Sequence, residues 1–209
     1  MQQKLILTLL VALFFISFNG VGQQKKIKAY LNERQFYAPS MGNYLEVQLH
    51  FAGHTLAYVT EKGDTYAEIE VSHIFSQNDT VVQFDKYVLK GPLVLDSIVE
   101  DFHDIQRYSL PAGTYQYELL VNDKNAERAP ISAEKEIVIS EMDGRVAVSN
   151  LSAAESIRPS GDKTSPFTKM GYNVIPMVTN YYPSELQLVQ LVDEIYHPDL
   201  FFEVGIHLS

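Results

Sequence analysis

Apolar and polar residues alternate with a period of two in several segments between residues 44 and 139. Successive side chains of a strand point to opposite faces, so this pattern predicts strands with one buried face. The expected strands cover residues 44–51, 55–60, 66–76, 80–89, 114–121 and 133–139. Residues 98–108 fit a strand or a helical stripe, and we favour a strand because a Pro-Gly turn follows. Turn residues recur about every ten residues, which predicts an all-β sandwich rather than parallel α/β units.

Residues 109–123 indicate the type of sandwich. A Leu-Pro-Ala-Gly turn leads into a strand that carries Tyr115 and Tyr117 on one face. In immunoglobulin-like sandwiches a Tyr near such a corner bonds back to the backbone and fixes the connection. We therefore expect an immunoglobulin-like domain in which Pro111, Gly113 and Tyr115 form a structural corner.

The first 22 residues have the layout of a secretory signal peptide. Lys4 provides a positive start, residues 5–18 an apolar core, and residues 19–22 small residues for cleavage before Gln23. A membrane anchor is the alternative, but spanning a bilayer takes about 20 apolar residues. A lipoprotein is excluded because the chain has no cysteine. We expect cleavage, export to the periplasm, cell surface or medium, and no membrane span afterwards.

Composition narrows the class of partner. Small secreted domains often depend on disulfides, so this cysteine-free chain must depend on packed apolar area for its stability. An exported protein without cysteine fits a bacterial periplasm or cell surface better than an animal extracellular space. The formal net charge of −10 repels phosphate backbones. We therefore expect protein partners and no nucleic acid, and leave the oligomeric state open.

The pattern changes beyond the first domain, which we place at residues 23–150. Residues 151–171 are polar, contain Pro and Gly and show no usable period, which predicts a linker or long loop. Further strand patterns follow, and residues 184–196 fit either a capped helix or a buried strand. One or two strands cannot bury their own apolar face. We expect residues 172–209 to be the start of a second β-sandwich module, truncated and therefore incomplete.

Two segments resemble the secreted GWxTD-domain proteins of Bacteroidota. Residues 34–49 combine an aromatic pair, a Pro-x-x-Gly turn and a Tyr-Leu-Glu-Val strand, like the opening of those proteins. Residues 182–186, with residues 194–196 and Phe201, resemble the start of their second sandwich module. The Gly-Trp-x-Thr-Asp motif itself is absent, since the chain has no tryptophan. The resemblance implies the N-terminal part of an exported, modular, non-catalytic envelope protein.

Marks of catalysis or metal binding are few. His50 and His54 have the spacing of metal ligands, and His73 lies on a nearby expected strand, but zinc needs three or four converging ligands. His50 shares its strand face with Glu46 and Gln48, which favours a solvated polar face. Acyl-transfer motifs and glycine-rich phosphate loops are absent. We expect no catalytic residue, no metal and no cofactor.

Two alternatives to a protein-contact function remain. A hydrolase would use two carboxylates of the densest acidic group, which comprises Asp96, Glu100, Asp101 and Asp104. We prefer to interpret that group as a solvated edge that discourages aggregation. A carbohydrate-binding module would use exposed aromatic rings, for which the candidates beside prolines are Phe36, Tyr37, Tyr181 and Tyr182.

Two tripeptides match a modification pattern. Asp79-Thr80-Val81 and Asp96-Ser97-Ile98 fit the Asp-Ser/Thr-aliphatic sites that bacteria of the resembled group O-glycosylate, at Thr80 and Ser97. The favoured function is that of an exported, non-catalytic β-sandwich protein that acts through protein contacts in the cell envelope.

Overall fold

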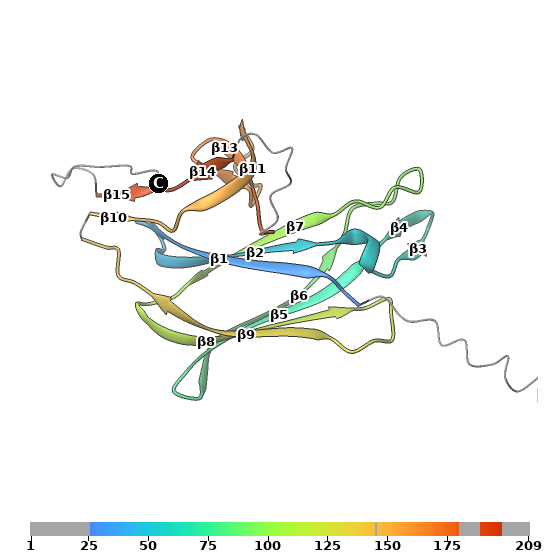
Figure 1. The fold of residues 1–209 in the computed structure, drawn as a ribbon, viewed down its shortest axis with the longest axis horizontal. Coiled ribbons are helices and arrows are strands. Elements are labelled where there is room, and N and C mark those ends of the chain that lie inside the picture. The colour runs from blue at the N-terminus through green and yellow to red at the C-terminus, as the bar shows by residue number, and fades with distance from the viewer. Residues whose placement is uncertain (1–25, 145, 180–188, 198–209) are drawn as a thin grey trace, which may run out of the picture.

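The computed structural model of this chain describes residues 26–144, 146–179 and 189–197 (Figure 1). Its regular elements there are strands, apart from one short 3₁₀ turn, η1 (Gly53–Thr55). The all-β prediction is therefore confirmed. Within the described ranges, no helix has the length and apolarity needed to cross a membrane. The expected signal peptide lies outside the described residues.

Seven strands make a sandwich of two antiparallel sheets. The first sheet has the order β1 (Ala29–Ala38), β2 (Gly42–Phe51), β7 (Phe102–Ser109). The second has the order β6 (Thr80–Lys90), β5 (Glu68–Gln77), β8 (Gly113–Asp123), β9 (Ile131–Ile139). A small hairpin, β3 (Val59–Glu61) with β4 (Asp64–Tyr66), precedes β5. Most of the expected strands lie in the sandwich, but the expected strand 55–60 is wrong for residues 55–58, because Thr55 belongs to η1 and only Val59 and Thr60 lie in β3. The pattern also did not predict β1.

The core lies between the two sheets, where the apolar positions of the alternating strands meet. Leu49, Phe51 and Phe75 are completely buried there, and Tyr117 and Val121 of β8 join the same cluster. Because the side chains of a strand alternate between faces, the residues between these positions point outward.

The corner before β8 is held by a hydrogen bond. The hydroxyl of Tyr115 donates to the backbone carbonyl of Pro111 at 2.8 Å. A Cβ atom at Gly113 would lie 2.7 Å from Nε2 of Gln77, so a larger residue there requires Gln77 to move. These contacts fix the path of the chain from β7 into β8.

A further, four-stranded sheet packs on the outer face of the first sheet (Figure 1). Its order is β12 (Thr168–Lys169), β13 (Tyr172–Pro176), β11 (Ser152–Pro159), β14 (Gln190–Val192). A short ladder of β10 (Ala147–Val148) and β15 (Ile195–Tyr196) lies beside it. We call these six strands the C-terminal unit.

The C-terminal unit corrects the expected boundaries. Residues 151–171 are not a linker, because they contain β11, which pairs with both β13 and β14. The Ser and Ala residues of β11 have a weak strand preference, which hid the strand from pattern reasoning. The unit also begins before residue 172. In the ambiguous segment 184–196, β14 and β15 are strands, and residues 184–188 lie outside the described residues.

Candidate functional site

The polar face of β2 lies under the C-terminal unit. Glu46 and Gln48 are 1% and 3% exposed, so the prediction of a solvated strand face is wrong for them. Alternation distinguishes two faces of a strand, but it does not say whether a polar face meets water or another polar surface. Here the second surface is β11 to β14.

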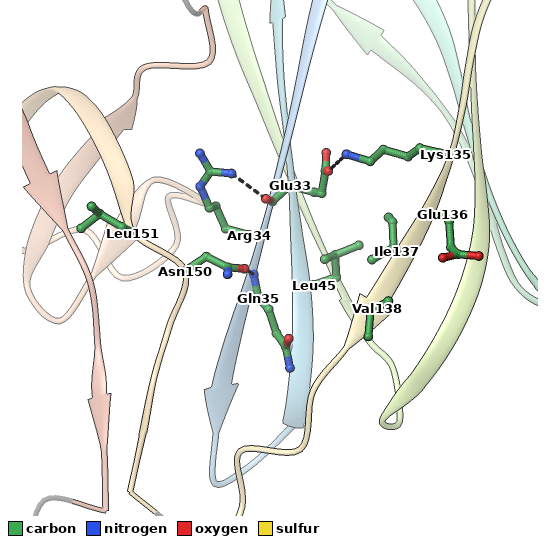
Figure 2. Close-up of a pocket in the computed structure, with 10 residues that line it drawn as sticks. All are labelled: Glu33, Arg34, Gln35, Leu45, Lys135, Glu136, Ile137, Val138, Asn150 and Leu151. Atoms are coloured by element: carbon green, nitrogen blue, oxygen red, sulfur yellow. Dashed lines mark hydrogen bonds and ion pairs between the residues drawn. The ribbon is translucent and has the colours of Figure 1, made fainter.

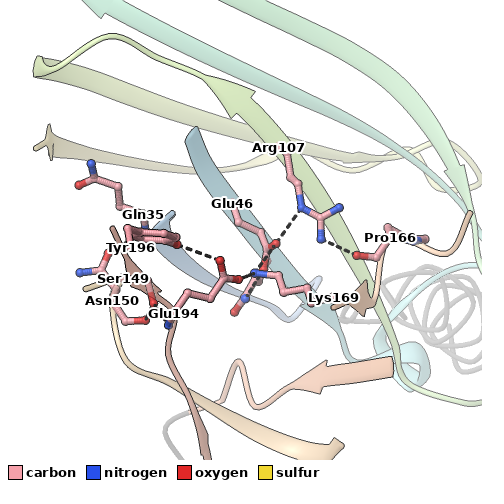
Figure 3. Close-up of polar contacts among 10 residues, drawn as sticks. Gln35, Glu46, Arg107, Ser149, Asn150, Pro166, Lys169, Glu194 and Tyr196 are labelled. Atoms are coloured by element: carbon pink, nitrogen blue, oxygen red, sulfur yellow. Dashed lines mark hydrogen bonds and ion pairs between the residues drawn. The ribbon is translucent and has the colours of Figure 1, made fainter. Parts of the chain in front are cut away.

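Glu46 is the centre of a charged cluster between the first sheet of the sandwich and the C-terminal unit (Figure 3). Its Oε2 atom accepts hydrogen bonds from Nε of Arg107 at 2.9 Å and lies 3.0 Å from Nζ of Lys169. Arg107 also donates to the carbonyl of Pro166 at 2.6 Å. Burial lowers the pKa of Lys169, and the carboxylate of Glu46 opposes that shift. The cluster joins β12 to the sandwich and acts as a structural contact.

Phe36, one of the rings expected to bind a ligand, is buried beside the same cluster. Phe36 is 1% exposed, stacks on Tyr44 and lies 3.2 Å below the ammonium group of Lys169. This corrects the expectation that Phe36 is an exposed ring, because a buried ring cannot stack on a sugar. Tyr37 is half-buried and its hydroxyl donates to Asp143 at 2.7 Å. Tyr181 and Tyr182 lie outside the described residues.

The acidic group does not converge on one site. Asp104 points into the sandwich, where it accepts hydrogen bonds from Tyr87 and Gln106. Burial raises the pKa of Asp104, and those hydrogen bonds oppose the shift. Asp101 instead accepts a hydrogen bond from the backbone of Gly53 at 2.9 Å. Asp96 and Glu100 are exposed in the loop before β7. Asp104 therefore fits neither the predicted solvated edge nor the predicted pair of catalytic carboxylates.

His73 is a core residue. It is completely buried, with Nδ1 2.8 Å from the hydroxyl of Tyr117 and Nε2 3.1 Å from that of Tyr87. Burial lowers the pKa of His73 to about 4, so the imidazole is neutral at pH 7. Both ring nitrogens of His73 therefore have Tyr hydroxyls as hydrogen-bond partners inside the sandwich. His50 does not lie beside His73, because it is on the outer face of the first sheet.

A groove of about 420 Å³ lies along one side of the sandwich, between β1 and β9 (Figure 2). Lys135 and Glu33 form an ion pair across it. Further along the groove, Gln35 connects β1 to the residue after β9, because its Oε1 atom accepts a hydrogen bond from the backbone N–H of Ser140 at 2.9 Å. Its backbone N–H also donates to Asn150 at 2.7 Å. These contacts tie the two sheets and the C-terminal unit together, which gives the groove a structural role.

The opposite side of the sandwich ends in a different kind of edge. β6 is the outermost strand of its sheet and, in the part of the chain that the structure describes, pairs only with β5. Four of its large apolar residues are about half exposed: Val81, Val82, Phe84 and Val88. The sequence reasoning identified the strand but missed this edge. A signal was available, because residues 80–89 are apolar on both faces.

The two lysines of β6 do not turn its apolar surface into a strongly charged one. Lys86 and Lys90 project from the strand, but they pair with Glu70 and Glu68 of β5 at 2.9 and 3.3 Å. Charged residues on an edge usually discourage pairing with another chain. Here their charge is partly balanced within the sheet, so the apolar residues dominate.

The two expected O-glycosylation sites lie at exposed tight turns. Thr80 follows Asn78 and Asp79, which both have positive φ in the β5–β6 hairpin. Ser97 and Asp96 also have positive φ, between the bridged residues Leu95 and Ile98. Both hydroxyl-bearing residues are exposed, and their modification stays a prediction.

No family model, curated protein or solved structure matches this chain. The resemblance to GWxTD-domain proteins therefore stays a prediction, as do the expected export and the assignment of the chain as non-catalytic.

Proposed function

We propose that this chain is an exported, non-catalytic protein of the cell envelope that acts by binding another protein, and that β6 is its contact strand. The observation that carries the proposal is that β6 pairs on one side only among the described residues and carries exposed apolar side chains. A free edge presents backbone N–H and C=O groups that a partner strand can pair with.

The side chains of β6 supply the rest of the contact. Phe84 lies opposite Ile74 of β5, so the apolar surface extends from the edge onto the sheet face. Each fully buried Val or Phe contributes about 1.5 to 3 kcal/mol, and partial burial in an interface contributes less. This surface belongs to the sheet that the C-terminal unit leaves uncovered (Figure 1).

The alternative functions have less support from the described residues. The glycan hypothesis loses one candidate ring, because Phe36 is buried against Lys169 of the C-terminal unit. The hydrolase hypothesis loses support because Asp101 and Asp104 bind different partners. The envelope location rests on the signal-peptide pattern and on the resemblance to the GWxTD-domain proteins.

Site-specific photo-crosslinking in an exporting Bacteroidota host tests the proposal. A photoreactive residue replaces Val82 or Phe84 in the full chain, and a matched control replaces Glu134, which is exposed on β9 at the other edge of the same sheet. We expect one discrete protein adduct from both β6 positions and none from position 134.

A companion variant, Phe84→Asp, should abolish the adduct formed from position 82 while the far-UV spectrum is unchanged. Three results contradict the proposal: no adduct, equal adducts from β6 and β9, or an adduct made only of two copies of this chain.

A further inference from the structure

Two histidines face each other on the outer face of the first sheet. His50 of β2 and His103 of β7 are directly opposite in the antiparallel register. Nδ1 of His50 lies 2.9 Å from Nε2 of His103, and the two ring planes are 87° apart. The sequence gives no spacing signal for this pair, because 53 residues separate the two positions.

The C-terminal unit adds a carboxylate to the pair. Glu155 of β11 places Oε1 3.6 Å from Nε2 of His103. One ligand atom from each of the three residues lies within 4.8 Å of the other two. The cluster therefore draws on both β-structures, with two ligands from the sandwich and one from the unit that covers it.

His50 also has a partner on its far side. Nε2 of His50 lies 3.4 Å from Oδ2 of Asp101, and Oδ1 of Asp101 is held by the backbone of Gly53 at 2.9 Å. Metal-binding histidines characteristically donate their second N–H to a carboxylate or a backbone carbonyl, which fixes the ring and its tautomer.

The outer contacts also bear on which ring nitrogens carry the hydrogens. If the outer nitrogens hold the hydrogens, the two facing nitrogens both present lone pairs beside a carboxylate. In that tautomeric state a cation between the three atoms stabilises the cluster, whereas in the other state one ring donates a hydrogen bond to the other at 2.9 Å.

We propose that His50, His103 and Glu155 bind a divalent transition-metal ion, with Zn²⁺ as the best match, and that Asp101 orients His50. Two imidazoles and a carboxylate are a common zinc ligand set, whereas Ca²⁺ and Mg²⁺ prefer oxygen ligands throughout. The His side chains are 12% exposed and Glu155 is 38% exposed, so an ion can enter from the Glu155 side and retain a water ligand. Because its ligands come from both β-structures, the ion would clamp the C-terminal unit onto the sandwich.

The proposal is independent of the contact function of β6, because it concerns the other sheet. Calorimetric titration of the EDTA-treated full chain with Zn²⁺ tests it directly. We expect one ion per chain, and a melting temperature that rises by roughly 5 to 10 °C when Zn²⁺ exceeds the Kd about 100-fold.

Two variants test the ligands, and a third serves as the control. His103→Gln and Glu155→Gln should each weaken Zn²⁺ binding at least about ten-fold, since each removes one ligand. His54→Gln is the matched control, because His54 is the exposed histidine whose spacing to His50 suggested a metal pair in the sequence. It should bind Zn²⁺ like the wild type.

Co²⁺ provides a readout that needs no variant. The wild-type chain should give a visible absorption band typical of four-coordinate Co²⁺ with nitrogen and oxygen ligands, and Zn²⁺ should displace it. Each variant is compared with wild type by far-UV circular dichroism in EDTA, so that loss of folding is distinguished from loss of a ligand. The proposal is overturned by a wild-type chain that neither binds Zn²⁺ nor shifts its melting temperature, or by a His54→Gln variant that loses affinity as strongly as His103→Gln.

Discussion

Nζ of Lys169 lies 3.0 Å from Oε2 of Glu46, and their side chains are 14% and 1% exposed. Lys169 belongs to β12 and Glu46 to β2, so this ion pair connects the C-terminal unit to the sandwich. A buried charge is costly unless it is paired, which makes the pair a sensitive point of the interface.

Replacement of Glu46 by Gln should lower the free energy of unfolding by about 3 to 5 kcal/mol, because it removes the buried charge that pairs with both Lys169 and Arg107 and leaves Lys169 the more distant carboxylate of Glu194, at 3.9 Å. Urea denaturation measures the loss. Glu70→Gln is the matched control, since Glu70 pairs with Lys86 at 2.9 Å on a more exposed surface, and it should cost about 1 kcal/mol or less. Equal losses in the two variants would contradict the interpretation of Glu46 as a buried anchor.

His73 should make stability depend on pH between about 4 and 6.5. Burial lowers its pKa to about 4 in the folded chain, from 6.5, so the unfolded chain binds more protons in that window. The contribution of His73 is therefore complete above pH 6.5 and is lost as pH falls towards 4, by about 3 kcal/mol.

Unfolding free energies of the wild type and of His73→Gln, measured at pH 7 and pH 4.5, check this sign and size. The wild type should lose more stability than the variant on acidification. Exposed His54→Gln serves as the control and should follow the wild type. Parallel pH profiles for wild type and His73→Gln would refute the prediction.

Tyr115→Phe should lower the free energy of unfolding by about 1 to 2 kcal/mol, because the hydrogen bond to the Pro111 carbonyl is lost without a change in ring packing. Tyr172→Phe is the comparison, since that residue is 50% exposed and its change should be within about 0.5 kcal/mol. Thermal or urea unfolding is sufficient to separate them. An effect of Tyr115→Phe no larger than that of Tyr172→Phe would show that the corner bond contributes little.

Replacing Phe75 or Phe84 by Ala compares the stability contribution of a core ring with that of a ring on the proposed contact strand. Phe75→Ala should cost about 3 to 5 kcal/mol because it leaves a cavity among completely buried residues. Phe84 is 56% exposed, and Phe84→Ala should cost about 0.5 kcal/mol or less. A large loss from Phe84→Ala would mean that β6 needs this ring for folding rather than for binding.

Local patterns predicted most of the sandwich strands. Alternation placed residues 44–51 and 80–89 on β2 and β6, and the Pro-Gly corner pointed to the start of β8. They did not reveal β11, whose Ser and Ala residues lack a strong strand preference. They also paired His50 with His54 by spacing, whereas the sheet register pairs His50 with His103.

The sequence by itself determined that this chain is all-β and which residues share a strand face, because side-chain direction follows from a period of two within one strand. Only the tertiary structure decided what each face meets. Glu46 and Phe84 both lie on outward faces of the sandwich, yet Glu46 is buried under the C-terminal unit and Phe84 remains exposed. That outcome depends on where residues more than a hundred positions away from Glu46 come to pack, and no local pattern records it.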